Sequence, residues 1–217
     1  MKHFKTTLAA IFFALFILFS TGIVYAQTPT PKDVFTTDIP ITYLGIDFSN
    51  SKLMGDSLIT LNDLTTKFEA INNVPISEVK KYDIGAALKK THMSNDLSVV
   101  KEHNDKTDPT KFLSKNEADF TKFKEADISK IVSGYNFKGK TGVGLVFIME
   151  GLSKTKERAS MYVTFVDMKT NKVIYTERME GKAGGIGYRN YWVRPVYEVI
   201  NEIKKHKDEE WIQKFSK

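Results

Sequence analysis

Three apolar segments in the second half of the chain constrain the fold more than any other feature. They are VGLVFIM at 143–149, SMYVTFVD at 160–167 and KVIYTERM at 172–179. Their β-branched and aromatic residues favour strands, and short connections join them. Strands joined in this way pair antiparallel with their neighbours. We therefore expect an antiparallel C-terminal meander, with residues 151–159 as a solvated hairpin loop.

Helical patterns surround these strands. Apolar residues recur every three or four positions over 57–73, around 126–132 and in a last helix that runs to about 205. Residues 40–48 are apolar on both faces, which is typical of a central, covered strand. The order predicts an α/β (α+β) fold with a single mixed β-sheet and helices packed on at least one face.

The amino terminus has the three parts of a secretory signal peptide. Lys2 and Lys5 precede an apolar run at 8–19, and the segment closes with Val24-Tyr25-Ala26. We expect residues 1–26 to be a cleaved signal peptide, so that the protein is periplasmic or secreted and has no transmembrane helix after cleavage. The alternative is an inner-membrane anchor made by residues 8–26, which are about long enough to span a bilayer.

The remaining chain has the length of one ordinary domain. Residues 27–38 contain two prolines and four threonines and are expected to form an extended tether, with a single domain at 39–217. The sequence has no cysteine, so disulfides and a lipid-modified cysteine are both excluded. An exported chain without disulfides is more typical of a bacterial envelope than of a small cross-linked extracellular scaffold.

The charge balance argues against nucleic acid as a partner. The net charge of +6 becomes +4 once Lys2 and Lys5 are removed, and the lysines are interleaved with acidic residues. A small, mixed charge is typical of a solvated surface. A small positive net charge is still compatible with weak attraction to an anionic polymer or lipid.

The stretch GYNFKGKT at 134–141 matches the spacing of a phosphate-binding P-loop. A P-loop needs a strand before it and a helix after it, so that the helix amino terminus faces the phosphate. Here a helical pattern precedes the stretch and a strand pattern follows it. We therefore interpret it as a helix-to-strand connection, with Gly134 at the helix end and Gly139 in a turn, and expect no nucleotide binding.

The glycine-rich stretch GKAGGIG at 181–187 is a better candidate because it follows a strand and precedes a helix. Its free amides, the helix amino terminus and two arginines would suit an anion. The alternative is structural: the glycines turn the chain from the sheet edge while Trp192 anchors the helix. The helix could begin at Asn190 or nearer Arg194. The candidate ligand-binding residues are Gly184, Gly185, Gly187, Arg189, Asn190 and Arg194.

A second candidate stretch, residues 47–56, follows the predicted central strand. Asp47 and Asn50 are its candidate ligand-binding residues, because α/β proteins bind ligands at the carboxyl ends of such strands. The alternative is that Asp47 only bonds a turn.

The sequence gives little support to catalysis. It has no thiol nucleophile and no Gly-x-Ser-x-Gly motif. The three histidines beyond residue 26, His92, His103 and His206, form no close pair of the kind that zinc sites use. We expect no catalytic residue, no metal and no cofactor, and regard a non-enzymatic role as favoured over an enzymatic one.

The segment VTFVDMKTNKVIYTERMEGKAGG, within residues 147–203, resembles a family of small α/β envelope domains. That family includes the amino-terminal domain of the Tol-system propeller protein, the periplasmic domain of the curli secretion channel and lipoprotein activators of peptidoglycan synthases. The chain departs from the pattern in its turn at Asn171 and in lacking a lipobox cysteine. The whole sequence is also similar in style to exported proteins of Bacteroidetes. These resemblances imply an architecture and no particular activity.

Two functions follow as hypotheses. The first is an exported cell-envelope protein that acts as a non-enzymatic binding module for an envelope protein or an anionic polymer. The alternative is a periplasmic hydrolase or small-anion-binding protein that uses the 47–56 loop and the 181–194 region. The alternative requires both regions to share one pocket.

Overall fold

The computed structural model describes residues 28–56 and 59–217, so the predicted signal peptide lies outside the described residues. The strands are β1 (Ile41–Asp47), β2 (Lys52–Met54), β3 (Met93–Asn95), β4 (Leu113–Ser114), β5 (Val143–Ser153), β6 (Arg158–Asp167) and β7 (Lys172–Lys182). The helices are α2 (Pro31–Thr36), α3 (Leu64–Ser77), α4 (Ile84–Ala87), α5 (Ser98–Asn104), α6 (Glu125–Ser133), α7 (Tyr188–Glu202) and α8 (Asp208–Phe215), with short helical turns η1 (Pro109–Lys111), η2 (Glu117–Thr121) and the π-helical η3 (Ile203–Lys207).

The described strands form one seven-stranded mixed sheet built around β5. On one edge β5 pairs antiparallel with β6, and β6 pairs antiparallel with β7. The other edge of β5 pairs in parallel with β1 along 143–148 and with β2 along 151–153. Since β6 occupies the opposite edge along this whole length, β1 and β2 lie end to end beside β5. Residues 48–51 separate the two strands.

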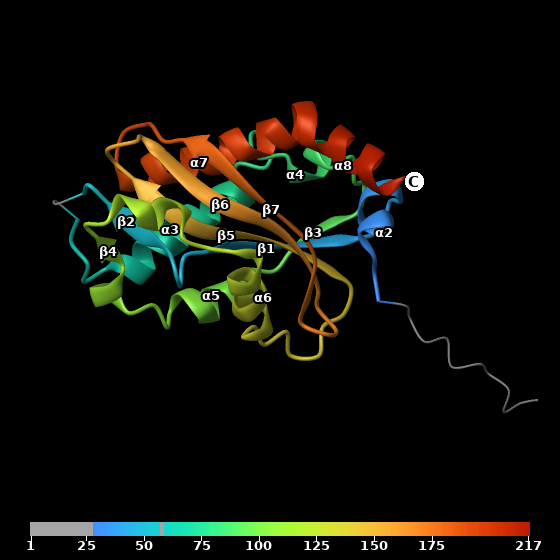
Figure 1. Cartoon of the computed structure of the whole chain (residues 1–217), viewed down its shortest axis with the longest axis horizontal. Helices are drawn as coiled ribbons and strands as arrows, with labels where there is room; N and C mark the ends of the chain where they lie inside the picture. Colours follow the sequence, from blue (N-terminus) through green and yellow to red (C-terminus); the bar gives the residue numbers. More distant parts are fainter. Residues whose placement is uncertain (1–27, 57–58) are drawn as a thin grey trace, which may run out of the picture.

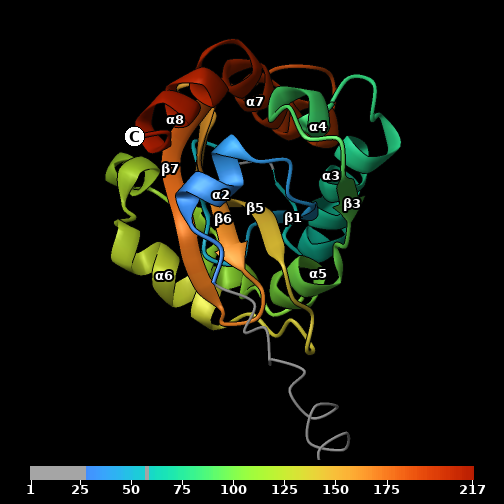
Figure 2. The ribbon, with the colours of Figure 1, turned by 90° about the vertical axis from the view of Figure 1, so that its right-hand side faces the viewer.

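Helices cover both faces of the sheet, as Figure 2 shows, with α4, α7 and α8 above it and α5 and α6 below. Alternate residues of each strand enter two separate cores. On β5, Leu145 and Phe147 pack with α3 and α7, whereas Val146 and Ile148 pack with α5 and α6. The expected mixed α/β sheet with helices is confirmed.

Residues 31–36 differ from the expected extended tether, because they form α2. Thr30 and Asp33 cap this helix reciprocally, and Pro31 occupies its first turn, where a proline costs no hydrogen bond. Figure 1 places α2 beside α8. There Phe35 is buried, with its ring centroid 5.1 Å from that of Trp211. The expectation of an extended segment is therefore wrong for these residues.

The hairpin between β5 and β6 is longer than the sequence indicated. Pairing continues through Ser153 and Arg158, and only 154–157 form the turn. A β-bulge opposite Ser160 leaves Glu150 outside the regular pairing, with its carboxylate fully buried. Arg178 Nε donates to that carboxylate at 2.7 Å, and the Phe123 amide donates at 2.6 Å. The strand therefore gains length without an unpaired buried charge.

Helix α7 begins at Tyr188, before both starts that the sequence indicated, and Pro195 lies inside it. The helix packs very closely on β7 at Gly181: a Cβ built on this glycine would lie 2.2 Å from the carbonyl oxygen of Pro195. Trp192 is fully buried beneath the helix. These contacts position the first turns of α7, which line the cleft described next.

Candidate functional site

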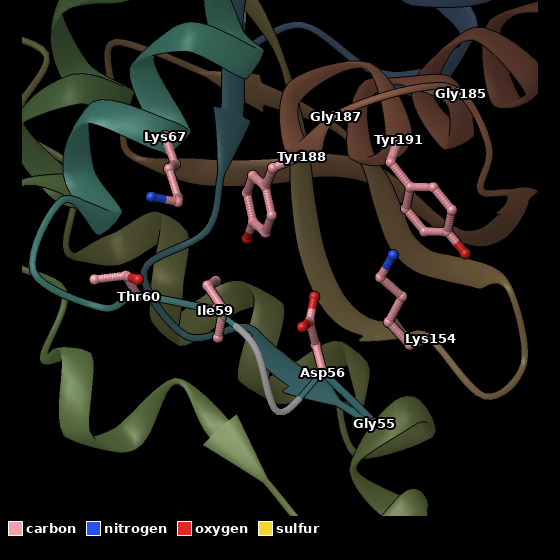
Figure 3. Close-up of a pocket in the computed structure, with 10 residues that line it drawn as sticks. All are labelled: Gly55, Asp56, Ile59, Thr60, Lys67, Lys154, Gly185, Gly187, Tyr188 and Tyr191. Atoms are coloured by element: carbon pink, nitrogen blue, oxygen red, sulfur yellow. The ribbon is translucent and has the colours of Figure 1, made fainter.

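A cleft of about 530 Å³ opens where the carboxyl end of β2, the β5–β6 turn and the start of α7 meet. Figure 3 shows its side chains. The first turns of α3 close the side opposite the β5–β6 turn. The lining residues are Gly55, Asp56, Ile59, Thr60, Lys67, Lys154, Gly185, Gly187, Tyr188 and Tyr191.

Two tyrosines of α7 form the aromatic side of the cleft. Tyr188 and Tyr191 are three residues apart and therefore lie on the same side of the helix. Their ring centroids lie 6.5 and 4.9 Å from that of the buried Trp192. Burial raises the pKa of both phenols above the usual value, so both stay uncharged at neutral pH. They offer apolar ring surface, and Tyr191 also offers its hydroxyl group, whereas the hydroxyl of Tyr188 is buried.

The charged side chains come from three other elements. The Nζ atom of Lys154, in the β5–β6 turn, lies 3.6 Å from the Tyr191 ring centroid, a cation–π contact. Lys67 on α3 forms an ion pair with Asp63, and its Nζ lies 5.9 Å from the Tyr188 ring centroid. Figure 3 shows Asp56 directed into the same space as Tyr188 and Lys154. The cleft thus combines two ammonium groups with one carboxylate.

The loop before α7 gives the cleft a polar backbone wall. Gly185 and Gly187 have φ angles of +115° and +81°, which residues with a side chain rarely adopt. The N-cap residue is Gly187, which has no side chain with which to cap α7. The first-turn amides and the positive end of the helix dipole therefore face outward beside the cleft, an arrangement that favours an anion.

The predicted residues of 181–194 are only partly brought together. Gly185 and Gly187 line the cleft, whereas Arg189 and Arg194 do not. Arg194 Nε donates to Glu198 at 2.6 Å along the exposed helix surface, and Arg189 Nε donates to Asn190 Oδ1 at 3.1 Å. The Asn190 side-chain amide donates to the Ile186 carbonyl and so links the loop to the first turn of α7. Gly184 and Asn190 lie outside the lining of the cleft. Lys67 and Lys154 supply the positive charge that we had predicted from the arginines.

The 47–56 stretch is divided in the same way. Gly55 and Asp56 line the cleft, but Asp47 and Asn50 lie elsewhere. Asn50 donates to Ser49 Oγ at 3.0 Å, and its carbonyl accepts from Lys122. It borders a separate small hollow.

Asp47 is buried at the end of β1 and is the centre of a polar network. Its Oδ2 accepts from Tyr135 Oη at 2.7 Å and lies 2.9 Å from His103 Nδ1, while its Oδ1 accepts from the Ser49 amide at 2.7 Å. Burial alone would raise the pKa of this carboxyl, but the hydrogen bonds from His103, Ser49 and Tyr135 outweigh burial and hold the pKa below its usual value. The network ties α5 and the segment after α6 to the sheet.

Asp47, His103 and Ser49 have the residue types of a catalytic triad but not its geometry. A triad places the aspartate on one imidazole nitrogen and the serine on the other, so that the base can remove the serine proton. Here Ser49 Oγ lies 3.0 Å from Nδ1, the same nitrogen that contacts Asp47. This arrangement cannot activate Ser49 as a nucleophile, and it supports the structural interpretation of Asp47.

The P-loop-like stretch lies between α6 and β5, which confirms the predicted order of helix and then strand. Lys138 and Gly139 both have positive φ and form a tight turn. Lys140 forms an ion pair with Asp96 and donates to Ser98 Oγ at 3.3 Å, so its ammonium group is held by side chains at the start of α5. The geometry is that of a connection, and absence of nucleotide binding stays a prediction.

Within 28–56 and 59–217, no group of three or more His, Asp or Glu side chains is placed to hold a metal ion. In the same ranges, no helix has both the length and the apolarity to cross a membrane. Comparison with protein-family models, with curated proteins and with solved structures finds no match to this chain.

Sequence reasoning missed Lys67, Lys154, Tyr188 and Tyr191 as site residues. Both tyrosines follow the glycine-rich stretch directly, and Lys154 lies at the tip of a predicted hairpin. The available signal was the cluster of aromatic and basic residues that directly follows the glycine-rich stretch, at 188–191. Their convergence depends on the long β5–β6 hairpin, which carries Lys154 to the start of α7.

Proposed function

We propose that the protein is an exported, non-enzymatic binding module of the cell envelope, and that it holds an anionic glycan in the cleft at the start of α7. One observation carries the proposal. Two tyrosines of α7 converge with Lys154 and Lys67, from two other elements, on a cleft of about 530 Å³. This size is within the range of small-ligand sites.

The chemistry of the cleft supports a ligand that combines apolar ring surface with negative charge. The faces of Tyr188 and Tyr191 can stack on the C–H surface of a sugar, and the Tyr191 hydroxyl can bond its hydroxyls. The ammonium groups of Lys67 and Lys154 and the uncapped amides of α7 favour a carboxylate, sulfate or phosphate group. Asp56 disfavours a ligand that is negatively charged throughout. An acidic sugar chain, with charge at intervals, fits this pattern.

The absence of a catalytic arrangement in the part of the chain described supports binding without turnover. Among the described residues that line the cleft, none is Ser, Cys or His. The Asp47–His103–Ser49 set lies away from the cleft and lacks the geometry of a triad. A binding role therefore needs fewer assumptions than a hydrolytic one.

Export and an envelope location rest on the amino-terminal sequence pattern and on the absence of cysteine. The resemblance to small α/β envelope domains favours the same compartment. A mature chain that begins at Gln27 would place α2 and the folded domain a few residues after the cleavage site.

The alternative, a small-anion-binding protein or periplasmic hydrolase, keeps one favourable observation. The ends of both candidate stretches, at Gly55–Asp56 and Gly185–Tyr188, line the same cleft. A free inorganic anion would use the lysines and the α7 amides without the tyrosine faces. The two ligand classes are therefore separable by a tyrosine substitution.

A melting-temperature titration of residues 27–217 tests the proposal, because a ligand that binds only the folded state raises its stability. The probes are an oligogalacturonate, a neutral maltooligosaccharide of equal length, and inorganic sulfate. We expect a shift with the oligogalacturonate that is lost in Lys154→Ala and in Tyr191→Ala. Arg189→Ala is the matched control, since Arg189 is exposed and outside the lining, and it should keep the shift.

The outcomes separate the hypotheses. No shift with the oligogalacturonate, or an equal shift with the neutral sugar, contradicts an anionic glycan site. A sulfate shift that survives Tyr191→Ala but not Lys154→Ala favours the small-anion alternative. Release of reducing ends from the oligogalacturonate would establish hydrolysis instead of binding.

A further inference from the structure

A second cavity, of about 520 Å³, lies over β1 and the edge strand β3 and has no lining residue in common with the cleft. Its walls come from the end of α3, from α4 and from the segment that leads into β3. The lining residues are Tyr43, Pro75, Val79, Tyr82, Asp83, Ile84, Gly85, Ala86, Lys90, Thr91, Met93 and Asn95.

Tyr43 is the unusual residue of this cavity. Its side chain is 1% exposed, and its ring packs edge-on against Phe147, with centroids 5.7 Å apart. The hydroxyl is buried and has no hydrogen-bond partner among the described residues. A buried hydroxyl without a partner destabilises a protein, so phenylalanine would be the favoured residue here if packing alone mattered.

The hydroxyl is able to bond a neutral ligand. Burial, together with the neighbouring Tyr82, raises the pKa of the Tyr43 phenol well above its usual value. The group is therefore an uncharged phenol at neutral pH, with one proton to donate and lone pairs to accept.

The charged groups around the cavity already have partners. Lys90, which is 9% exposed, donates to the Thr37 carbonyl. Burial lowers the pKa of its ammonium group, and the charges of Asp38 and Asp208 oppose this shift only in part. The Asp83 carboxylate accepts from the Ala86 amide at 2.9 Å as the cap of α4. A charged ligand would lose water here without gaining a free counter-charge, which is costly.

Part of the remaining wall is apolar, beside the polar side chains of Thr91 and Asn95. Pro75, Ile84 and Met93 face the cavity, and Val79 at its rim is 54% exposed, which is high for a large apolar side chain. Covering such surface with an apolar ligand is favourable in proportion to the area removed from water.

We propose that this cavity binds an uncharged molecule with an apolar body and one carbonyl or hydroxyl group, and that this group hydrogen-bonds the Tyr43 hydroxyl. This site is independent of the proposed glycan cleft and goes beyond that function.

Fluorescence titration with prodan, an uncharged naphthyl ketone, tests the proposal. We expect saturable, blue-shifted emission with the wild-type protein. Tyr43→Phe should weaken binding about threefold to tenfold, the range of one net hydrogen bond. Ala86→Trp, which places a large ring on the exposed wall of α4, should abolish binding. Tyr162→Phe is the matched control and should leave prodan affinity unchanged, because Tyr162 lies in the other core.

A second readout separates a ligand contact from a structural role. Tyr162 Oη donates to the Phe123 carbonyl at 2.8 Å, so Tyr162→Phe should lower the midpoint of urea unfolding. Tyr43→Phe should leave the midpoint unchanged or raise it. The proposal is overturned if wild type does not bind prodan saturably, if Tyr43→Phe binds it equally well, or if Ala86→Trp retains binding. A midpoint for Tyr43→Phe as low as that of Tyr162→Phe would also overturn it, because the hydroxyl would then have a protein partner.

Discussion

Replacing Gly181 by alanine tests how the start of α7 is positioned. Gly181 is buried near the end of β7, where the sheet meets the helix. A Cβ at this position would lie 2.2, 2.6 and 2.7 Å from the carbonyl oxygen, Cα and carbonyl carbon of Pro195. All three are backbone atoms, so no side chain can rotate away. Ordinary contact begins near 3.4 Å, so strand and helix must separate by about 1 Å.

The expected cost follows from what that separation disturbs. Overpacking a well-packed core costs about 1–3 kcal/mol. Gly181→Ala should fall at the upper end, about 3 kcal/mol, because α7 buries Trp192, Val196 and Val199 against the sheet. Urea unfolding followed by tryptophan fluorescence measures this, since Trp192 and Trp211 are both buried. A loss of this size is a large part of the stability of an ordinary domain.

Gly184→Ala is the matched control. It makes the same chemical change three residues later, but a Cβ there meets no atom of the described residues within 4 Å, and its φ is not positive. The unfolded-state effect of Gly→Ala is the same for both, so it cancels in the comparison. Gly184→Ala should stay within about 0.5 kcal/mol of wild type. The reasoning is refuted if Gly181→Ala is as stable as Gly184→Ala.

Four further predictions concern other parts of the molecule. Trp192→Ala should cost about 3–5 kcal/mol in urea unfolding, because the indole is fully buried; a loss below 1 kcal/mol would contradict that packing. Asp47→Asn should cost about 1–3 kcal/mol near neutral pH. The folded pKa of Asp47 lies below the unfolded value of about 3.9, so its contribution is present above that pH and lost as the pH falls through the folded pKa. The difference between Asp47→Asn and wild type should therefore shrink below about pH 4, and a constant difference from pH 7 to pH 3 would refute this. Lys140→Ala should cost less than about 1 kcal/mol, as expected of a partly exposed ion pair, and ATP should not raise the melting temperature of either protein. Intact-mass measurement of the exported protein should find Gln27 as the first residue, whereas a mass that begins at Met1 would indicate the membrane anchor.

The sheet was predictable where periodicity and turn spacing are strong. The boundaries of β5, β6 and β7 differ by at most four residues from those of the segments expected from apolar runs, because buried central strands require such runs. The interruption at 48–51 was not predictable, since β1 and β2 pair with the same edge of β5 and only that long-range pairing defines their relation.

Local signals existed for two elements that we predicted differently. Thr30 and Asp33 have the spacing of a capping box around Pro31, but the threonine and proline content favoured an extended segment. Pro195 argued for a late start of α7. The packing of Trp192 and the close approach of β7 at Gly181 outweigh the cost of a proline inside the helix.

The candidate site was predictable as a region but not as a set of side chains. The glycines of 184–187 mark the loop because positive φ favours glycine, and Gly185 and Gly187 do line the cleft. The arginines had the right charge in the right segment, yet the helical rotation places Arg189 and Arg194 outside the lining. Lys154 comes from a turn more than thirty residues away in sequence, so only the fold brings it to Tyr191.

The central claim is that the cleft at the start of α7 holds an anionic glycan, and amide chemical-shift mapping tests it most directly. On titration of ¹⁵N-labelled residues 27–217 with oligogalacturonate, the amides of Gly55, Lys154, Gly187 and Tyr188 should shift together and saturate at one common affinity. Shifts confined to the hollow around Asn50 and Lys122, or no saturable shifts at all, would contradict the claim.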